Sequence, residues 1–310
     1  MLLPISLLCV GFFLLFFGGN MLIDGAVRVA RRLGVSNLLI GLVLVGFGTS
    51  MPEFLTNVMA VVKGSTDLAV GNVVGSNIAN VLLVFAIMII INPVSVQIIQ
   101  FKKNAFFLVL SCLLVLGCGI FGIINFYMGL ILTLLLLGYV WYMYKTDTGG
   151  EGAELEEFIS KNKDTSLVKP FFKSFAGLLV TLAGAKLLVD NAVILAEMLH
   201  ISQDVIGLTV VAVGTSLPEL AVSILAAVKK QNDVAFGNIL GSNIFNLLFV
   251  LGVPALIRPL PISAQLLNDI FIMMVITFVL IGIAFWRKSF SRATGVVFLF
   301  AYALYIFYLF

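Results

Sequence analysis

The sequence GTSMPE occupies residues 48–53, and nearly the same six residues, GTSLPE, recur at 214–219. They belong to a longer repeat, since residues 18–93 align without a gap with residues 184–259, 166 positions further on. Of the 76 aligned pairs 33 are identical, and GNVVGSNIAN in the first half matches GNILGSNIFN in the second. Hydrophobic helices that match by chance share Leu, Val and Ile, whereas these segments share Thr, Ser, Pro, Glu and Asn. The chain is therefore predicted to contain two related halves.

The composition predicts a membrane protein. Of the 310 residues, 61% belong to the set AVILMFWYC and 11% are charged, against about 45–50% and about 25% in an ordinary soluble domain. A soluble fold of this length could not bury so much apolar surface, which excludes a water-soluble enzyme and a nucleic-acid-binding protein. The predicted fold is all-α and polytopic. Apolar runs predict ten membrane-spanning helices near residues 3–25, 37–62, 68–91, 104–123, 126–144, 171–197, 203–228, 234–257, 266–286 and 293–310.

The basic residues predict the orientation of these helices in a cell membrane. With the N-terminus outside, fifteen of the 18 Lys and Arg residues lie in inner connections, and only Lys63 and Arg258 lie in outer ones. Both termini are then outside. The chain divides into a first five-helix repeat (1–144), a cytoplasmic linker (145–170) and a second five-helix repeat (171–310), which together form one integral membrane domain.

The odd number of spans in each half makes the repeat an inverted one, because the second half must enter the membrane upside down. Inverted repeats with polar, Pro-interrupted helices at matched positions are typical of secondary transporters whose binding site lies near the middle of the bilayer. The sequence therefore predicts transport rather than catalysis, with no cofactor. The partners expected are inorganic cations and the lipid bilayer, with no obligate protein partner.

Two carboxylates fall deep in the predicted membrane, Glu53 in the second span and Glu219 in the seventh. A single carboxylate at that depth costs about 2.5–3.5 kcal/mol on insertion scales. No Lys or Arg occupies the midpoint of any span, so either both Glu residues are protonated or a bound cation supplies the positive charge. A purely structural role, in which the pair only bonds neighbouring helices, does not explain why the surrounding hydroxyl and amide residues are repeated too.

The neighbours of both Glu residues carry oxygen. Pro52 and Pro218 each remove a backbone donor and disfavour helical geometry in the residue before, so a kink that frees carbonyl oxygens is expected. The oxygen-bearing side chains are Thr49, Ser50, Thr215 and Ser216 before the prolines, and Asn72, Ser76, Asn80, Asn238, Ser242 and Asn246, which recur every four residues along the third and eighth spans. The small-residue steps Gly71–Gly75 and Gly237–Gly241 let helices approach closely.

Such a set of oxygens suits hard cations. Ca²⁺ takes six to eight oxygen ligands, whereas nitrogen and thiolate donors favour transition metals. Two carboxylates would neutralise one Ca²⁺. The same oxygens could hold Na⁺, or the carboxyl groups could hold protons, since a carboxyl group removed from water favours its neutral form.

At these motifs the chain resembles the cation/calcium exchanger superfamily, and most closely the prokaryotic sodium/calcium antiporters. The resemblance covers nearly the whole length, with GTSxPE and GNxxGSNIxN in both halves. It implies alternating access, in which Ca²⁺ and Na⁺ compete for sites between the second, third, seventh and eighth helices. It also implies that the first and sixth helices, which carry the matched Asp24 and Asp190, slide past this core. Because both Asp residues lie near span ends, capping at the membrane interface remains the simpler reading of that pair.

The resemblance also implies roles for individual residues. The Ca²⁺ ligands would be Glu53 and Glu219, with backbone carbonyls near Thr49 and Thr215. The adjoining Na⁺ sites would use Thr49, Ser50, Ser76, Thr215, Ser216 and Ser242, together with the carbonyls of Gly46 and Ala212. Asn80 and Asn246 would close the centre. Many sodium/calcium exchangers are acidic at the position of Asn246, and this departure leaves the stoichiometry, the involvement of K⁺ and the choice of Na⁺ over H⁺ open.

The leading interpretation is a Ca²⁺/Na⁺ antiporter that extrudes Ca²⁺. A Ca²⁺/H⁺ antiporter using the same carboxylates is the nearest alternative, and a cation channel lined by the repeated polar helices is a more distant one. An intramembrane hydrolase is disfavoured, because the sequence offers neither a suitable nucleophile–base pair nor an aspartyl dyad at matched depth.

Overall fold

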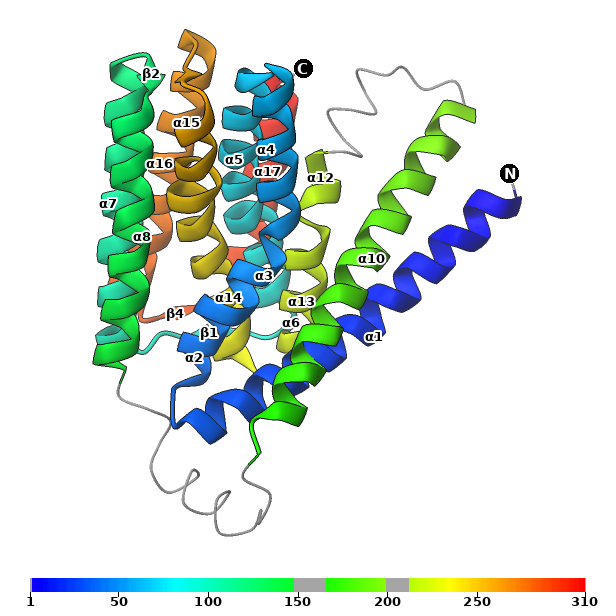
Figure 1. The fold of residues 1–310 in the computed structure, drawn as a ribbon. Helices are drawn as coiled ribbons and strands as arrows, with labels where there is room; N and C mark the ends of the chain where they lie inside the picture. Colours follow the sequence, from blue (N-terminus) through cyan, green and yellow to red (C-terminus); the bar gives the residue numbers. More distant parts are fainter. Residues whose placement is uncertain (1, 148–165, 199–211, 310) are drawn as a thin grey trace.

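The computed structural model describes residues 2–147, 166–198 and 212–309, and these are almost entirely helical (Figure 1). Six long helices in the described residues are unbroken. They are α1 (Leu2–Leu33), α7 (Ile98–Ile120), α8 (Phe126–Thr146), α10 (Val168–Met198), α16 (Ala264–Arg287) and α17 (Arg292–Leu309). All six are long and apolar enough to cross a membrane.

Two further spanning helices lie in the centre of the bundle and are the most completely buried. Each changes to π-helical geometry midway. The first consists of α5 (Thr66–Ala79), η2 (Asn80–Phe85) and α6 (Ala86–Ile91), and the second of α14 (Asn232–Phe245), η4 (Asn246–Val250) and α15 (Gly252–Ile257). Both π segments begin at the last Asn of the repeated motif, and such segments occur frequently at functional sites. The sequence pattern did not predict them.

The second predicted span is bent. It consists of α2 (Asn37–Ile40), η1 (Gly41–Gly46) and α3 (Phe47–Thr49), followed after Ser50 by α4 (Met51–Lys63), and its two parts differ in direction by 41°. The kink predicted beside Pro52 is therefore confirmed. The break itself falls at Ser50, because proline is tolerated in the first turn of a new helix, where its missing N–H would be unpaired anyway.

The seventh predicted span, 203–228, is described only from residue 212. There α12 (Ala212–Thr215) and α13 (Leu217–Val228) are separated at Ser216, whose backbone angles (φ −86°, ψ 5°) nearly equal those of Ser50 (φ −81°, ψ 4°). The described residues thus contain eight spanning helices, or nine with the bent one, where the sequence predicts ten.

Two short strand pairs join the halves of the chain. β1 (Val94–Ser95) pairs with β4 (Ser289–Phe290), and β2 (Ile123–Ile124) pairs with β3 (Leu260–Pro261), both antiparallel. The 166-residue offset relates β1 to β3 and β2 to β4, so the two pairs are equivalent. Each pair takes one strand from each half.

Helices α1 and α10 form a separate pair, which leans away from the other helices in Figure 1. Their backbones almost touch, since a Cβ atom on Gly18 would overlap the backbone of Thr181 and one on Gly177 would overlap that of Leu22. Close backbone approach through small residues is the usual way in which membrane helices associate firmly. We therefore treat α1 and α10 as one packed unit.

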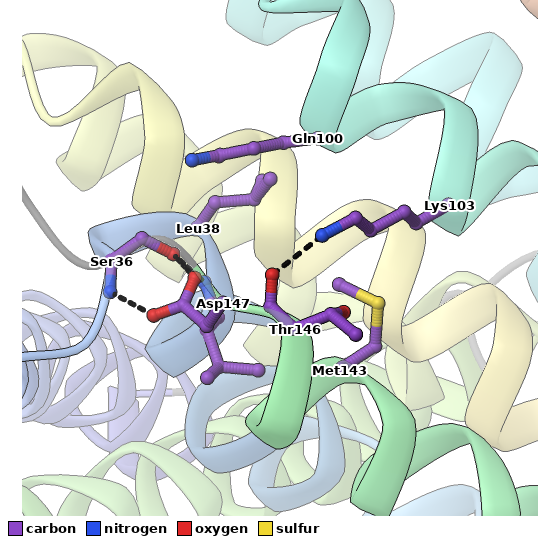
Figure 2. Close-up of a pocket in the computed structure, with 8 residues that line it drawn as sticks. Ser36, Leu38, Gln100, Lys103, Met143, Thr146 and Asp147 are labelled. Carbon is purple, nitrogen blue, oxygen red and sulfur yellow. Dashed lines mark hydrogen bonds between the residues drawn. The ribbon is translucent and has the colours of Figure 1, made fainter.

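The turn between α1 and α2 is held by the end of α8 (Figure 2). Asp147 accepts hydrogen bonds from the backbone N and the Oγ of Ser36, both at 2.7 Å, while Lys103 Nζ donates to the carbonyl oxygen of Thr146. Ser36 in turn caps α2 by accepting from Leu39 N at 3.1 Å. This contact fixes where the bent span leaves the α1–α10 pair.

Candidate cation-binding site

Glu53 and Glu219 are both fully buried, with 0% of each residue exposed. Each lies in the first turn of the helix that follows a break, Glu53 in α4 and Glu219 in α13. The positive end of a helix dipole favours a carboxylate there. The two breaks meet, since Ser50, which directly precedes the helix of Glu53, bonds the carboxyl group of Glu219. The matched breaks thus bring two acidic groups together in the middle of the bundle.

The broken segment of the first half lies directly against Glu219 of the second. Ser50 Oγ donates to Glu219 Oε1 at 3.2 Å, and Ser242 Oγ on α14 lies 3.4 Å from the same oxygen. The equivalent bond from Ser216 to Glu53 is not formed, and the Ser216 hydroxyl has no partner. The site is therefore asymmetric although its residues are repeated.

Thr49 and Gly46 complete this side of the site. Thr49 Oγ1 donates to Asn238 Oδ1 at 3.0 Å and lies 3.3 Å from Ser242 Oγ. The carbonyl oxygen of Gly46 lies 3.3 Å from both Thr49 Oγ1 and Ser242 Oγ. Hydroxyl, amide, carboxyl and carbonyl oxygens from both halves thus lie within hydrogen-bonding distance of one another here.

Several polar atoms in this region have no hydrogen-bond partner. Apart from two nitrogens of Arg32, they are all the unpartnered, fully buried side-chain N and O atoms in the described part of the chain. They are Oε1 and Oε2 of Glu53, Oε2 of Glu219, Oγ of Ser216, Oδ1 of Asn80, Nδ2 of Asn243, and both amide atoms of Asn77 and Asn246. Each unpaired buried group costs about 1–3 kcal/mol, so this concentration indicates a site that is completed by an ion.

The remaining predicted residues lie at varying distances from this cluster. Ser76 is buried on α5, Thr215 lines a cavity beside Pro52 and Pro218, and Ala212 begins α12. Asp24 and Asp190 lie elsewhere and form ion pairs with lysines. Asn72 donates to Asn57 Oδ1 at 2.8 Å, so its amide group bonds α4.

Close helix packing is observed for one of the two predicted glycine steps. A Cβ atom on Gly237 or Gly241 would overlap the backbone of α2 and η1, where Leu38 and Leu42 lie. At Gly75 no described atom lies within 4 Å of such a Cβ position, and at Gly71 only a leucine side chain does. The second-half step therefore brings α14, with Asn238 and Ser242, against the segment that carries Gly46.

The sequence reasoning did not single out four polar residues that the structure places in or beside the site. Asn243 Oδ1 accepts from Asn80 Nδ2 at 3.2 Å, and Asn77 is its equivalent on α5. Asn57 and Ser223 are also equivalent, and each bonds the first Asn of its motif, Asn57 with Asn72 and Ser223 with Asn238 at 2.9 Å. Their recurrence as polar residues at the same offset was the available signal.

The donor set is suited to hard cations. Within residues 2–147, 166–198 and 212–309, no group of three or more His, Cys, Asp or Glu side chains could hold a metal ion. The acidic complement of the site is therefore two carboxylates surrounded by neutral oxygens. Such a set fits Ca²⁺ or Na⁺ and does not provide the nitrogen or thiolate ligands of a transition-metal site.

A polytopic helical membrane protein with a buried, oxygen-lined site is the architecture of an ion transporter, and comparison with known proteins identifies which kind. The family described as sodium/calcium exchanger protein matches residues 3–145 and 170–310. The chain therefore belongs to the sodium/calcium exchanger family, whose members transport these cations across membranes by antiport.

Relatives match the chain over nearly its whole length. The putative antiporter CaxA of Alkalimonas amylolytica is 35% identical, over 100% of this chain and 99% of the relative. The sodium/calcium exchanger MaX1 of Methanosarcina acetivorans is 30% identical, over 98% and 97%. The solved structure of a sodium/calcium exchanger from Methanococcus jannaschii superposes with a TM-score of 0.87 at 31% identity, covering 98% of each chain.

Proposed function

We propose that this protein exchanges Ca²⁺ for Na⁺ across the cell membrane by alternating access and normally extrudes Ca²⁺. The observation that carries the proposal is the pair of fully buried carboxylates, Glu53 and Glu219, on equivalent broken helices, with three of their four carboxyl oxygens unpartnered. Without a counter-charge of its own, the pair requires a cation or protons. The protein acts as a transporter rather than as an enzyme, and it needs neither a cofactor nor an obligate protein partner.

In this proposal Ca²⁺ binds between Glu53 and Glu219, with carbonyl oxygens near Thr49 and Thr215. Na⁺ occupies adjoining positions lined by Thr49, Ser50, Ser76, Thr215, Ser216, Ser242 and the carbonyls of Gly46 and Ala212. Asn80 and Asn246 close the centre. The hydrogen bonds that Ser50 and Ser242 direct at Glu219 support a shared site, because the same oxygens serve either ion.

We further propose ten spans in two inverted repeats, residues 1–144 and 171–310, joined by a cytoplasmic linker, with both termini outside. Equivalent contacts support this arrangement. The strand pairs β1–β4 and β2–β3 are related by the 166-residue offset, and so are the bonds Asn57–Asn72 and Ser223–Asn238.

Exchange follows from electrostatics. An empty site carries two negative charges and is costly to move through a low-dielectric barrier, whereas a site loaded with cations moves readily. Uptake of one ion therefore depends on release of the other. If net charge crosses, each elementary charge contributes about 2.3 kcal/mol per 100 mV of membrane potential.

The test is ⁴⁵Ca²⁺ uptake into proteoliposomes loaded with Na⁺, compared with vesicles loaded with an equal concentration of choline. We expect rapid uptake only with an outward Na⁺ gradient. Uptake that follows an imposed pH gradient without Na⁺ would instead identify a Ca²⁺/H⁺ antiporter. A Ca²⁺ conductance with no counter-ion requirement would identify a channel.

A further inference from the structure

A cavity of about 400 Å³ opens between α4, α10, α12 and α13. Pro52 and Pro218, which adjoin the two buried carboxylates, lie on its wall. Thr56, Val189 and Asp190 line it as well. By the predicted orientation this is the outer end of the bundle, so the cavity leads from outside toward the candidate site.

The equivalent space in the other half is filled. The 166-residue offset relates Thr56 to Val222 and Val189 to Ile23, and these two are 0% and 1% exposed. A Cβ atom on Gly19, the equivalent of the cavity-lining Ala185, would overlap the side chain of Leu225. Helix α1 therefore packs tightly against α13. The equivalent helices α10 and α4 are instead separated by the open cavity. As far as the described residues go, the structure is open at one end and closed at the other.

An ion pair spans the closed end. Lys229, which directly follows α13, places Nζ 2.7 Å from Asp24 Oδ1 and also lies 3.4 Å from the carbonyl oxygen of Asn20 on α1. Lys173 on α10 holds the other carboxylate oxygen of Asp24 at 3.1 Å. Asp24 is thus shared between a lysine of its own α1–α10 unit and a lysine of the core. The side chains of Lys229 and Asp24 are 29% and 42% exposed, so solvent screens the pair only in part.

The equivalent pair at the open end is separated. Asp190 is the counterpart of Asp24 and Lys63 is the counterpart of Lys229, with the identical residue in each case. Asp190 bonds Lys186 on its own helix at 3.4 Å, and Lys63 forms no ion pair with any residue that the structure describes. Each Asp therefore has a lysine within the α1–α10 unit, but among the contacts between described residues only Asp24 is also bound to the core.

We propose that Asp24–Lys229 and Asp190–Lys63 are alternating latches, one for each end of the transport pathway. This inference rests on the proposed inverted repeat and alternating access. When the α1–α10 unit moves to close the outer cavity, Lys229 releases Asp24 and Lys63 binds Asp190. Lys173 and Lys186 keep each carboxylate paired in the state in which its latch is open. One latch is closed in each state, so the free energies of the two states stay close. The bound ions can then decide which state is populated.

The test uses Thr56→Cys as a reporter in the outer cavity, in a background with Cys9, Cys112 and Cys118 replaced by Ala. A membrane-impermeant maleimide is added outside, and its labelling rate reports how much of the protein is open to the outside. Opening the inner latch with Lys229→Gln should depopulate the outward-open state. We expect the labelling rate to fall by about two- to fivefold, the range that partly exposed ion pairs provide. The matched variant Lys63→Gln, at the equivalent position, should leave the rate unchanged or raise it.

Two further measurements keep the result interpretable. Asp24→Asn should lower the rate as Lys229→Gln does, and combining the two should add little, because they remove the same interaction. A monodisperse size-exclusion peak for every variant separates a latch effect from misfolding. Unchanged labelling in Lys229→Gln, or an equal fall in Lys63→Gln, would overturn the proposal. Because labelling requires no ion gradient, it reports on the latches even if the transported ions differ from Ca²⁺ and Na⁺.

Discussion

The positions of Glu53 and Glu219 depend on local geometry that is the same in both halves. Each directly follows a proline, and each is the third residue of a helix that begins immediately after a Ser at which the previous helix stops. The side chain is thereby fixed at the positive end of a helix and turned toward the middle of the bundle. No nearby lysine or arginine bonds either carboxylate within the described residues, so a bound cation or protons have to balance their charge.

We expect Glu53→Gln and Glu219→Gln each to reduce Na⁺-dependent Ca²⁺ uptake by about 100-fold or more, in line with the roughly 3–5 kcal/mol effect of removing one charge from a buried charged set. The same substitution at Glu156 in the predicted linker is the matched control and should retain uptake. Full activity in either site variant, measured at equal protein incorporation, would remove the electrostatic basis of the proposed function.

Asn246 offers a test of ion selection, because both its amide atoms are buried and unpartnered. Asn246→Asp would give the site a third negative charge, and we expect one more positive charge to accompany each Ca²⁺. The reversal potential of Ca²⁺ flux at fixed Na⁺ gradients measures this ratio. Asn80→Asp, at the equivalent position, is the companion variant. An unaltered reversal potential in both would place these residues outside the transport site.

The site residues that sequence reasoning missed share a physical cause. A stripe of every fourth residue describes a helix that presents one face to a site, and it found Ser242 and Asn246. Helix α14, however, is buried on all sides, so Asn243, one position off the stripe, also reaches polar neighbours. Polar identity at the repeat offset would have been the better criterion, since it also marks Asn57 and Ser223.

At the scale of the elements, proline and glycine placed the broken helices and one close helix contact correctly. The π-helical segments η2 and η4 were not foreseen, because an extra residue within a helical turn leaves the apolar pattern of a buried helix unchanged. The same limitation applies to the strand pairs, which are only two residues long. Their pairing depends on contacts between distant parts of the chain.

Gly241 tests whether close packing of α14 on η1 supports the site. In Gly241→Ala the new methyl group would overlap the backbone of Leu42, so we expect the free energy of unfolding to fall by about 1–3 kcal/mol. Gly138→Ala on α8 is the control, because no described atom lies within 4 Å of a Cβ at that position. Thermal melting in detergent should show a lower midpoint for the first variant only, and equal midpoints would contradict the packing argument.

For the molecule as a whole, composition was enough to predict an all-helical membrane protein, and the repeated motifs carried its resemblance to the exchanger family. They could not indicate which face of the bundle is open, because that depends on how α1 and α10 lean against the core. Identical residues in the two halves take different partners, as Asp24 and Asp190 do. In the proposed alternating-access cycle, the repeated sequence would encode both states and the structure would correspond to one of them.

The orientation can be tested directly. We expect short epitope tags at the N-terminus and the C-terminus to bind antibody on intact spheroplasts, since the distribution of basic residues predicts that both ends are outside. A tag inserted near residue 155 should bind antibody only after the membrane is permeabilised. A terminal tag that is hidden in intact spheroplasts would overturn the predicted topology.

The two strand pairs have a consequence for assembly. Since β1 and β2 each find their partner in the opposite half, neither half has a complete set of contacts of its own. Two polypeptides made separately, 1–150 and 160–310, should each be degraded when expressed alone and should reconstitute ⁴⁵Ca²⁺ flux when co-expressed. The exchanger would then be, in physical terms, an obligate heterodimer whose subunits happen to be tethered. Stable accumulation of either fragment by itself would show that the strand pairs are incidental to assembly.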